Sequence, residues 1–350
     1  MHRSRGVLAS CTKAITGVAV MQLIEEGRVS LNDAARKYLP EIAHLQILDG
    51  FDAAREPLLR KPEHDLTIDQ LMLHTAGFGC DFFGANLKKY RELGRIPSSL
   101  GATRAGVVDV LIHEPGERWT YGSSIEWLGL IVEVICGKRL GEVLAERVFA
   151  PLGMEDIGFT MTPSMRARPA AIHPRAADGQ LPPQPDLVLP QPPELGRGGA
   201  AVYGNVGGYT KFVRMILNDG AGPCGRVLQP KTVQQLVRNC PGTLKSAGWV
   251  TANAGYSNSG EFFSGVSKLW AYTFQVVADD VCTGRPAGSL SWAELANTFS
   301  WIDRKNGLGG MWATQILPFQ DIGSYPGFVE FETMVYRPTR SCAVDALQEL

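Results

Sequence analysis

A serine and a lysine three positions apart stand in the segment ASCTKAIT, residues 9–16, and could form a nucleophile with its own base. If a helix begins here, Ser10 and Lys13 lie on one helix face, and the hydroxyl and the amine come together. A lysine held partly out of water has a lowered pKa and can accept the serine proton. The first N–H groups of the helix would help to stabilise an oxyanion. The alternative is a helix cap followed by a solvated lysine, because a chain of this composition contains about one such pair by chance.

Tyr121, in the segment RWTYGSS at residues 118–124, is a second candidate for acid–base chemistry. A phenol beside a lysine ammonium is pushed toward phenolate and can act as a general base. The alternative is an ordinary surface aromatic. The six histidines are isolated, and the chain has no HExxH, GxSxG or GxxxxGK motif, so neither a metal nor a cofactor is expected. His74 and His113 are expected to satisfy loop hydrogen bonds.

The pattern of apolar residues predicts the elements that position these side chains. Helices are expected over residues 10–26, 123–138, 140–154, 207–220 and 230–239. Segment 179–200 contains six prolines and is expected to be a loop, because proline removes backbone donors. Strands rich in aromatic and β-branched residues are expected over residues 269–279, 289–303 and 310–317. Helices first and strands last predict an α+β fold with a largely antiparallel sheet from the last third of the chain.

Composition excludes several classes of protein. The net charge of -1 argues against a nucleic-acid or anionic-membrane surface, since either needs a basic excess. No apolar run reaches the ~18 residues that a membrane span requires. The seven cysteines are scattered singly, which suits free thiols in a reducing compartment. A soluble, cytoplasmic protein is therefore expected.

Six segments in this order resemble the serine β-lactamase-like family: ASCTKAITGVAVMQLIEEGRVSLNDAARKYLPE, LTIDQLMLHTAGFG, PGERWTYGSSIEWLGLIVEVICGK, VFAPLGMEDIGF, GGAAVYGNVGGYTKFVRMILNDG and SWAELANTFSWIDRKNGLGGMWATQIL. Their motifs are nearest to the fungal lovastatin-type transesterases. The resemblance implies a β-lactamase/transpeptidase-like α+β fold, in which an antiparallel sheet flanked by helices adjoins a mainly helical region. The sheet region would comprise residues 1–39 and 171–350, and the helical region residues 40–170. Only nine residues precede Ser10, so the N-terminal strands of this sheet are expected to be missing.

The resemblance also implies roles for individual residues. Ser10 would be the acylated nucleophile, while Lys13 and Tyr121 would exchange its proton. The strand motif that reads KTG in the β-lactamases is similar to Trp292–Glu294. By that alignment the backbone N–H groups of Ser10 and Leu295 would bind the oxyanion.

Three residues depart from the family pattern. Ser123 replaces an asparagine whose amide grips an acylamino group, and Trp292 replaces a lysine that binds the β-lactam carboxylate. Both changes point away from antibiotic hydrolysis and toward neutral ester or thioester substrates. Glu294 stands where the family usually has glycine. A carboxylate at this place could repel the developing charge or block close approach, which favours a binding protein without turnover.

These observations predict a serine acyltransferase, or transesterase, in secondary metabolism. It would move an acyl group from an ester or thioester, free or carried by an acyl carrier protein, through a Ser10 acyl-enzyme to a hydroxyl of a small molecule. Two alternatives stay open: an esterase of the same family, in which water is the acceptor, and a non-catalytic binding protein. Phe82, Phe83, Trp119, Trp127 and Trp292 are candidates to line an acyl or polyketide pocket, although core packing is the role expected for most of them.

Overall fold

A five-stranded antiparallel sheet from the last third of the chain forms the centre of the protein, for which a computed structural model describes residues 6–94, 96–107, 110–238 and 244–348. The strand order is β12-β11-β10-β9-β8. The strands are β8 (Lys268–Ala271), β9 (Phe274–Val277), β10 (Leu290–Glu294), β11 (Thr298–Asp303) and β12 (Leu308–Trp312). The expected α+β architecture is confirmed. Segments 269–279 and 289–303, however, each form two strands, because tight turns at Thr273 and Asn297 adopt positive φ values of 67° and 62°.

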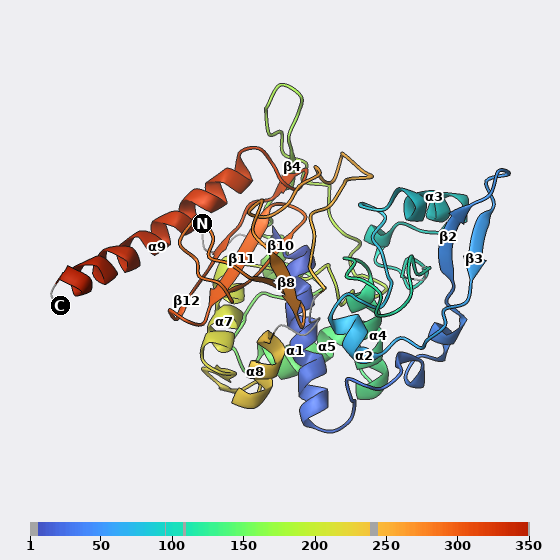
Figure 1. The fold of residues 1–350 in the computed structure, drawn as a ribbon, viewed down its shortest axis with the longest axis horizontal. Coiled ribbons are helices and arrows are strands. Elements are labelled where there is room, and N and C mark those ends of the chain that lie inside the picture. The colour runs from blue at the N-terminus through green and yellow to red at the C-terminus, as the bar shows by residue number, and fades with distance from the viewer. Residues whose placement is uncertain (1–5, 95, 108–109, 239–243, 349–350) are drawn as a thin grey trace.

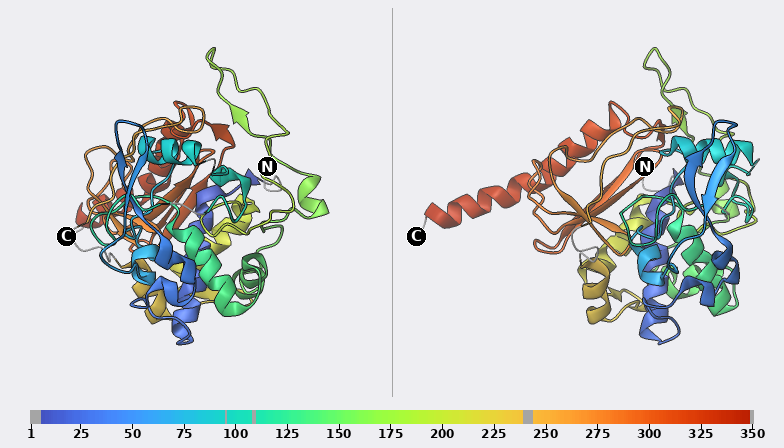
Figure 2. Two further views of the ribbon diagram at one scale, coloured as in Figure 1. Left: turned by 90° about the vertical axis from the view of Figure 1, so that its right-hand side faces the viewer. Right: turned by 45° about the vertical axis from the view of Figure 1, so that its right-hand side comes forward.

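The two faces of this sheet pack against different helices (Figure 1). Side chains alternate between the faces along each strand. Ala293, Phe299 and Trp301 join an aromatic cluster with helix α9 (Ser324–Gln348). Leu290 and Ile302 face the larger core that contains α1 (Thr12–Glu25) and α7 (Val206–Leu217). The far end of α9 projects away from the body of the protein (Figures 1 and 2).

Helix α1 is surrounded by protein along most of its length. All residues from Thr12 to Leu23 are buried. The helix contacts α4 (Ser124–Cys136), α5 (Leu140–Leu144) and α8 (Pro230–Val237). Gly17 has no room for a side chain, since a Cβ atom there would lie 2.7 Å from Thr273. A helix that is apolar on every side belongs in a core, which explains why its sequence shows no polar face.

The region of residues 40–170 contains most of the remaining helices and one hairpin. Its helices are α2 (Ile68–Met72), α3 (Ala85–Leu93), α4, α5 with a following π turn (Ala145–Phe149), and α6 (Pro163–Arg166). The hairpin of β2 (Ile47–Phe51) and β3 (Pro57–Arg60) was not expected from the sequence. The boundaries between this region and the sheet region stay a prediction.

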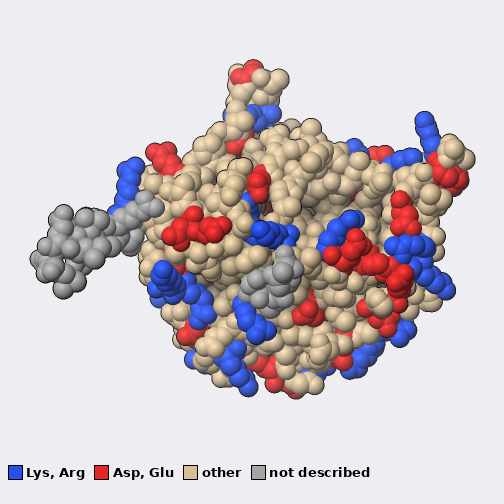
Figure 3. All heavy atoms as spheres, in the orientation of Figure 1, with Lys and Arg blue, Asp and Glu red and all other residues tan. Residues whose placement is uncertain are grey.

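Short strand pairs and irregular segments complete the fold. The paired strands are β1 (Gly6–Val7) with β5 (Tyr203–Gly204), β4 (His173–Pro174) with β13 (Ile316–Leu317), and β6 (Ala221–Gly222) with β7 (Gly225–Arg226). The proline-rich segment 179–200 forms no helix or extended strand, as expected. In the described ranges, no helix is both long and apolar enough to cross a membrane. Acidic and basic side chains are interspersed on the face seen in Figure 3.

Candidate active site

Ser10 lies in a single 3₁₀ turn, Ala9–Cys11, that leads into α1. The helix was expected to begin at Ser10 but begins at Thr12. Ala9 has a φ of 27°, a left-handed backbone that costs a residue other than glycine about 1–3 kcal/mol. The Leu8 N–H donates to the carbonyl of Val202 at 2.7 Å, which fixes the chain just before this turn. The nucleophile candidate therefore sits on a strained turn between a paired segment and a buried helix.

The hydroxyl oxygen of Ser10 accepts hydrogen bonds from both expected partners. The Tyr121 phenol donates to it at 2.7 Å and the Lys13 ammonium at 3.2 Å. Lys13 is only 5% exposed, and its Nζ atom lies 4.7 Å from the centre of the Tyr121 ring. The structure thus brings together the three side chains that the family resemblance implies as nucleophile, base and acid. Either Lys13 or Tyr121 is close enough to take the Ser10 proton.

Lys13 is held by a network of buried groups that sequence reasoning missed. Its Nζ atom donates to the Gly199 carbonyl at 2.7 Å. The Glu126 carboxylate accepts the Gly199 N–H at 2.9 Å and a hydrogen bond from the Arg197 guanidinium at 2.5 Å. A Cβ atom on Gly199 would lie 2.9 Å from Glu126 Oε1 and 3.2 Å from Lys13 Nζ. The loop of residues 197–199 therefore aims a carbonyl at Lys13, and only glycine fits there without moving a charged group.

Tyr121 is positioned by close backbone packing. A Cβ atom on Gly122 would lie 2.3 Å from the carbonyl oxygen of Phe78, so this residue must be glycine. The N–H of Thr120 donates to the carbonyl of His74 at 2.9 Å, and the Gly122 N–H approaches His74 Nδ1 at 3.4 Å. Burial, with a smaller contribution from the Lys13 charge, holds the pKa of His74 well below its usual range. A neutral His74 with Nδ1 as acceptor fits this geometry, and it has the loop-bonding role expected from the sequence.

A cavity of about 410 Å³ opens beside Ser10, and most of its wall is apolar. Four of the five candidate aromatic residues line it, namely Phe82, Phe83, Trp119 and Trp292, although core packing was expected for most of them. Trp127 does not, because its ring is buried in the core and stacks on Phe78 with 5.8 Å between ring centres. Three further aromatic residues of the wall were missed, namely Trp249, Phe262 and Phe319. The last two belong to the aromatic cluster under α9, which no local sequence pattern connects with Ser10.

The three residues expected to bind the substrate or its oxyanion also line this cavity. Ser123 is the N-cap residue of α4, and its buried Oγ has no hydrogen-bond partner among the described residues. The Trp292 ring packs against Tyr121 with 5.0 Å between ring centres and against Trp270 with 4.7 Å. Leu295 is the first residue of the turn between β10 and β11, next to the aromatic wall.

Glu294 is buried, and its carboxylate is engaged by its own hairpin. Glu294 Oε2 accepts the N–H of Ala296 at 2.9 Å, and Oε1 accepts the N–H of Thr298 at 3.1 Å. Burial raises the pKa of Glu294 to about 8. The charge that was expected to disturb an oxyanion is therefore largely absent near neutral pH.

Other reactive groups at the cavity contribute little. Cys80 lines the wall, but burial raises the pKa of its thiol to about 12, so it stays protonated. Within the described ranges, no three His, Cys, Asp or Glu side chains are grouped so that they could hold a metal ion. Ser10 lines the cavity, and its hydroxyl is in contact with two side chains that can exchange a proton with it.

Comparison with known proteins places this chain in a family. A family model described as beta-lactamase matches residues 2–324. The chain belongs to the β-lactamase family. The match confirms the expected β-lactamase/transpeptidase-like fold.

Among the curated relatives of this chain, two are named as transferases and one as an esterase. The acyltransferase mokF of Monascus pilosus is 32% identical over 233 residues, which are 65% of this chain and 55% of that protein. Lovastatin esterase of Penicillium rubens is 29% identical over 331 residues, 89% of this chain and 79% of that protein. The monacolin J acid methylbutanoyltransferase of Aspergillus terreus matches at 32% identity with the same two shares, 65% and 55%. The chain thus spans little more than half the length of the curated transferases it matches.

The solved structure of unliganded simvastatin synthase from Aspergillus terreus superimposes with a TM-score of 0.82. It is 26% identical, and the superposition covers 96% of this chain and 84% of that one. A hydrolase with promiscuous acyltransferase activity, EstCE1, is 22% identical with a TM-score of 0.70 and supports the fold. Trp292 is apolar and Ser123 is short. The resemblance implies a lysine and an asparagine at these two positions in the antibiotic-hydrolysing members of the family.

Proposed function

We propose that this protein is a serine acyltransferase that forms an acyl-enzyme on Ser10 and passes the acyl group to a hydroxyl of a small molecule. The observation that carries the proposal is the pair of hydrogen bonds, from Tyr121 at 2.7 Å and Lys13 at 3.2 Å, on the Ser10 hydroxyl. A nucleophile with a base and an acid in contact is the arrangement that covalent acyl transfer requires. The names of the relatives support transfer as the reaction.

The proposed reaction has two steps, and Lys13 and Tyr121 transfer the protons in both of them. Ser10 Oγ attacks the acyl carbonyl while its proton passes to the Lys13–Tyr121 pair, which for this step holds one proton fewer than an ammonium and a phenol together. The tetrahedral intermediate collapses, the bond to the leaving thiol or alcohol breaks, and the pair returns the proton to that group. The acceptor hydroxyl then attacks the ester carbonyl, gives its proton to the same pair, and the proton returns to Ser10 Oγ as the product leaves.

The cavity supports neutral, largely apolar substrates. Its aromatic wall suits an acyl chain or an alicyclic acceptor, and Trp292 offers no charge for a substrate carboxylate. We propose an ester or thioester donor, either free or held by an acyl carrier protein, and an acceptor from secondary metabolism. A cytoplasmic location is part of the proposal, because Cys224 and Cys282 are exposed free thiols that suit a reducing compartment.

Esterase activity is the second candidate. It is favoured by the match to lovastatin esterase, which extends over 79% of that protein. The same acyl-enzyme serves both reactions, and the difference lies in whether water or an alcohol reaches it. A binding protein without turnover is less favoured, since Glu294 is turned into its own hairpin.

Intact mass after incubation with an activated ester or an acyl thioester tests the proposal. An acyl adduct that peptide mapping places on Ser10 is expected, and its absence at every time and donor would contradict the acyl-enzyme. Adding an alcohol acceptor and measuring ester product against free acid then separates the two activities. Free acid alone at high acceptor concentration would leave the esterase as the function.

A further inference from the structure

In the turn between β10 and β11, one residue, Glu294, accepts most of the backbone N–H hydrogen bonds. Three of its N–H groups are taken by Glu294. The Ala296 and Thr298 N–H groups bind the carboxylate, and the Asn297 N–H donates to the Glu294 carbonyl at 3.1 Å. Leu295 N–H has no acceptor among the residues that the structure describes. One donor in the turn is therefore left available, and it belongs to a residue on the wall of the Ser10 cavity.

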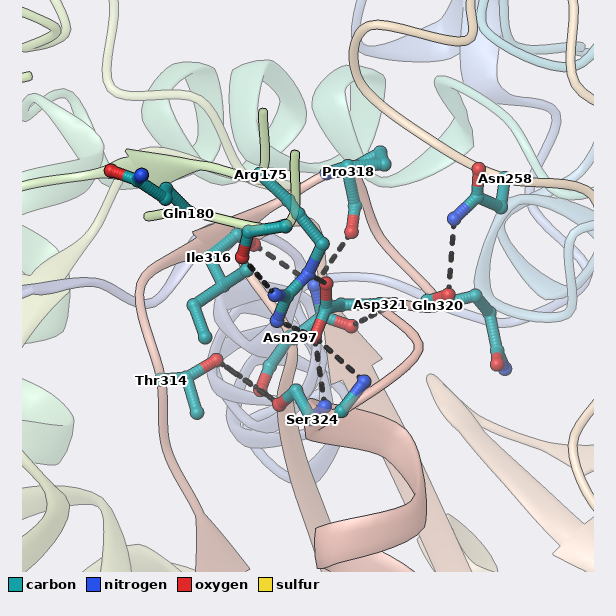
Figure 4. A network of polar contacts seen from close by, with 12 residues as sticks. Arg175, Gln180, Asn258, Asn297, Thr314, Ile316, Pro318, Gln320, Asp321 and Ser324 are labelled. Carbon is teal, nitrogen blue, oxygen red and sulfur yellow. Dashed lines mark hydrogen bonds and ion pairs between the residues drawn. The ribbon is translucent and has the colours of Figure 1, made fainter. Parts of the chain in front are cut away.

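The opposite side of the turn is fixed by a second set of hydrogen bonds, drawn in Figure 4. The Asn297 amide donates to the carbonyls of Ile316 and Pro318 at 2.9 and 2.8 Å. Its oxygen accepts the N–H of Asp321 at 3.0 Å. Thr314 Oγ1 donates to the carbonyls of Ala296 and Asn297 at 2.9 and 3.0 Å. Asn297 itself is fully buried, which strengthens the hydrogen bonds that its side chain makes.

Asp321 connects this set to two further parts of the chain. Its carboxylate accepts the N–H groups of Gly323 and Ser324, at 3.0 and 2.9 Å, where α9 begins. Arg175 donates to the same carboxylate at 2.9 Å (Figure 4). The outer side of the turn is thus anchored to α9 and to the segment after β4. The inner side, which faces α1, has only Glu294 as its side-chain anchor among the described residues.

We propose that Glu294 is a positioning residue for the oxyanion site: its carboxyl group takes the other N–H groups of the β10–β11 turn and leaves that of Leu295 directed to the acyl oxygen. This inference rests on the proposed acyl transfer at Ser10. It reverses the expectation that a carboxylate at this position disables the site. A donor placed before the reaction needs no reorganisation as charge develops, which is how such groups stabilise a transition state.

The protonation state of Glu294 follows from what surrounds it. Glu294 has the same parity along β10 as Leu290, which places it on the sheet face turned to α1. Of the titratable groups on α1, the turn before it and α7, Cys11, Lys13 and Tyr209 are buried, whereas Glu25, Lys211 and Arg214 are exposed. Burial raises the pKa of both the Cys11 thiol and the Tyr209 phenol, so neither brings a charge. A neutral Glu294 accepts N–H bonds without repelling the oxyanion, whereas the ionised form above about pH 8 would slow acylation.

Two substitutions separate the parts of this proposal. Glu294→Ala removes the acceptor and frees the turn. We expect it to lower the rate of Ser10 acylation by at least about tenfold with little change in KM, less than the ~10²–10³-fold cost of deleting an oxyanion donor. Glu294→Gln keeps one acceptor oxygen and cannot ionise. Its rate should stay within about threefold of the parent at pH 7 and should not share the parent's fall above about pH 8.

Ser291→Ala is the matched control, since Ser291 lies on the same strand but outside the cavity wall. Rates should be expressed per active site, titrated with a fluorophosphonate, so that a loss of folded protein is not counted as a loss of rate. Amide hydrogen exchange of Ala296 and Thr298 gives a readout that does not depend on activity. Both amides should exchange faster in Glu294→Ala than in the parent, and their exchange rates should be unchanged in Ser291→Ala.

Two results would overturn the role of Glu294. One is unchanged exchange of these amides in Glu294→Ala. The other is a combination of two findings. Glu294→Ala acylates at the parent rate per active site, and the ratio of the acylation rates of the parent and Glu294→Gln stays constant from pH 6 to pH 9. Absence of any Ser10 adduct in the unsubstituted protein would instead contradict the proposed function, and the exchange rates would still decide whether Glu294 holds the turn.

Discussion

The phenolic oxygen of Tyr121 lies 2.7 Å from the hydroxyl oxygen of Ser10, although 111 positions separate the two residues in the chain. The Lys13 ammonium lies 4.7 Å from the centre of the Tyr121 ring, and the Trp292 ring packs against the same ring. The hydrogen bond holds the partly buried phenol on the oxygen that reacts.

Tyr121→Phe tests this relationship directly. The substitution keeps the ring packing and removes the proton carrier, so we expect acylation to slow by ~10²–10⁴-fold with KM nearly unchanged. Stopped-flow acylation with a p-nitrophenyl ester measures the effect. Tyr38→Phe is the control, because the Tyr38 hydroxyl binds Asp33 outside the cavity. A parent-like rate for Tyr121→Phe would remove the phenol from the mechanism.

Ser10→Ala should abolish covalent labelling by a fluorophosphonate and leave the melting temperature nearly unchanged. The hydroxyl carries little packing, and its loss leaves the Tyr121 and Lys13 donors beside a cavity that water can enter. Ser164→Ala, at an exposed position, should label like the parent. Turnover at the parent rate in Ser10→Ala would show that another residue is the nucleophile.

Gly199→Ala should reduce activity more than stability. The atoms that an added Cβ would crowd are Glu126 Oε1 and Lys13 Nζ, the ends of two flexible side chains, so the backbone can stay in place while the charged groups move. We expect the rate of acylation to fall by about tenfold or more, since a displaced base loses its alignment. Gly255→Ala is the control, because a Cβ atom there would meet only Asn253 at 3.6 Å. Equal rates for both variants would contradict the role of the 197–199 loop.

Penicillins and cephalosporins should be turned over negligibly beside short aryl esters or acyl thioesters. The wall offers the Trp292 ring where a β-lactam carboxylate would need a cation, and Ser123 is too short to reach an acylamino group. Parallel assays with nitrocefin and an aryl ester at equal enzyme concentration check this expectation. Comparable kcat/KM values for the two substrates would refute it.

Glu294 should make the protein less stable as pH rises. Its pKa is about 8 in the folded protein against an ordinary value of 4.5. Between these values the folded protein keeps a proton that the unfolded chain has lost, so the stabilisation is complete below 4.5 and is lost by about pH 8. The slope from this one group reaches about 1.4 kcal/mol per pH unit. Urea unfolding of the parent and Glu294→Gln from pH 5 to pH 8 should show their difference shifting in favour of the glutamine variant. Parallel curves would contradict the shifted pKa.

The sequence predicted the parts of the site that carry a local pattern. Ser10 and Lys13 are close in the sequence, and Tyr121 precedes a helix that was expected over residues 123–138 and extends over Ser124–Cys136. Glu126 and Arg197 could not be predicted, because they are 71 positions apart and meet only through tertiary packing. Local composition does not reveal which distant charges will be buried together.

The elements of the fold also fall into those that a local pattern predicted and those that it did not. Strand-forming composition was recognised, but the turns at Thr273 and Asn297 were not, since neither contains the glycine that usually marks a positive φ. Trp127 was a candidate for the cavity wall with core packing as the alternative, and its place on α4 puts it in the core. Helix α9 was not expected at all, and its buried face includes Phe328 and Tyr336.

The buried position of α1 has a consequence for how the protein acquires its shape. The partners of α1 are spread along the chain. For example, Thr16 donates to the carbonyl of Gly198, which lies 182 residues later. Contacts of such long sequence separation form slowly, because the closure of long loops comes before the stabilisation they bring. A helix synthesised before its partners must therefore remain without cover until those later segments emerge from the ribosome. Refolding yield should depend on protein concentration and on chaperones, since the exposed α1 surface invites association between chains.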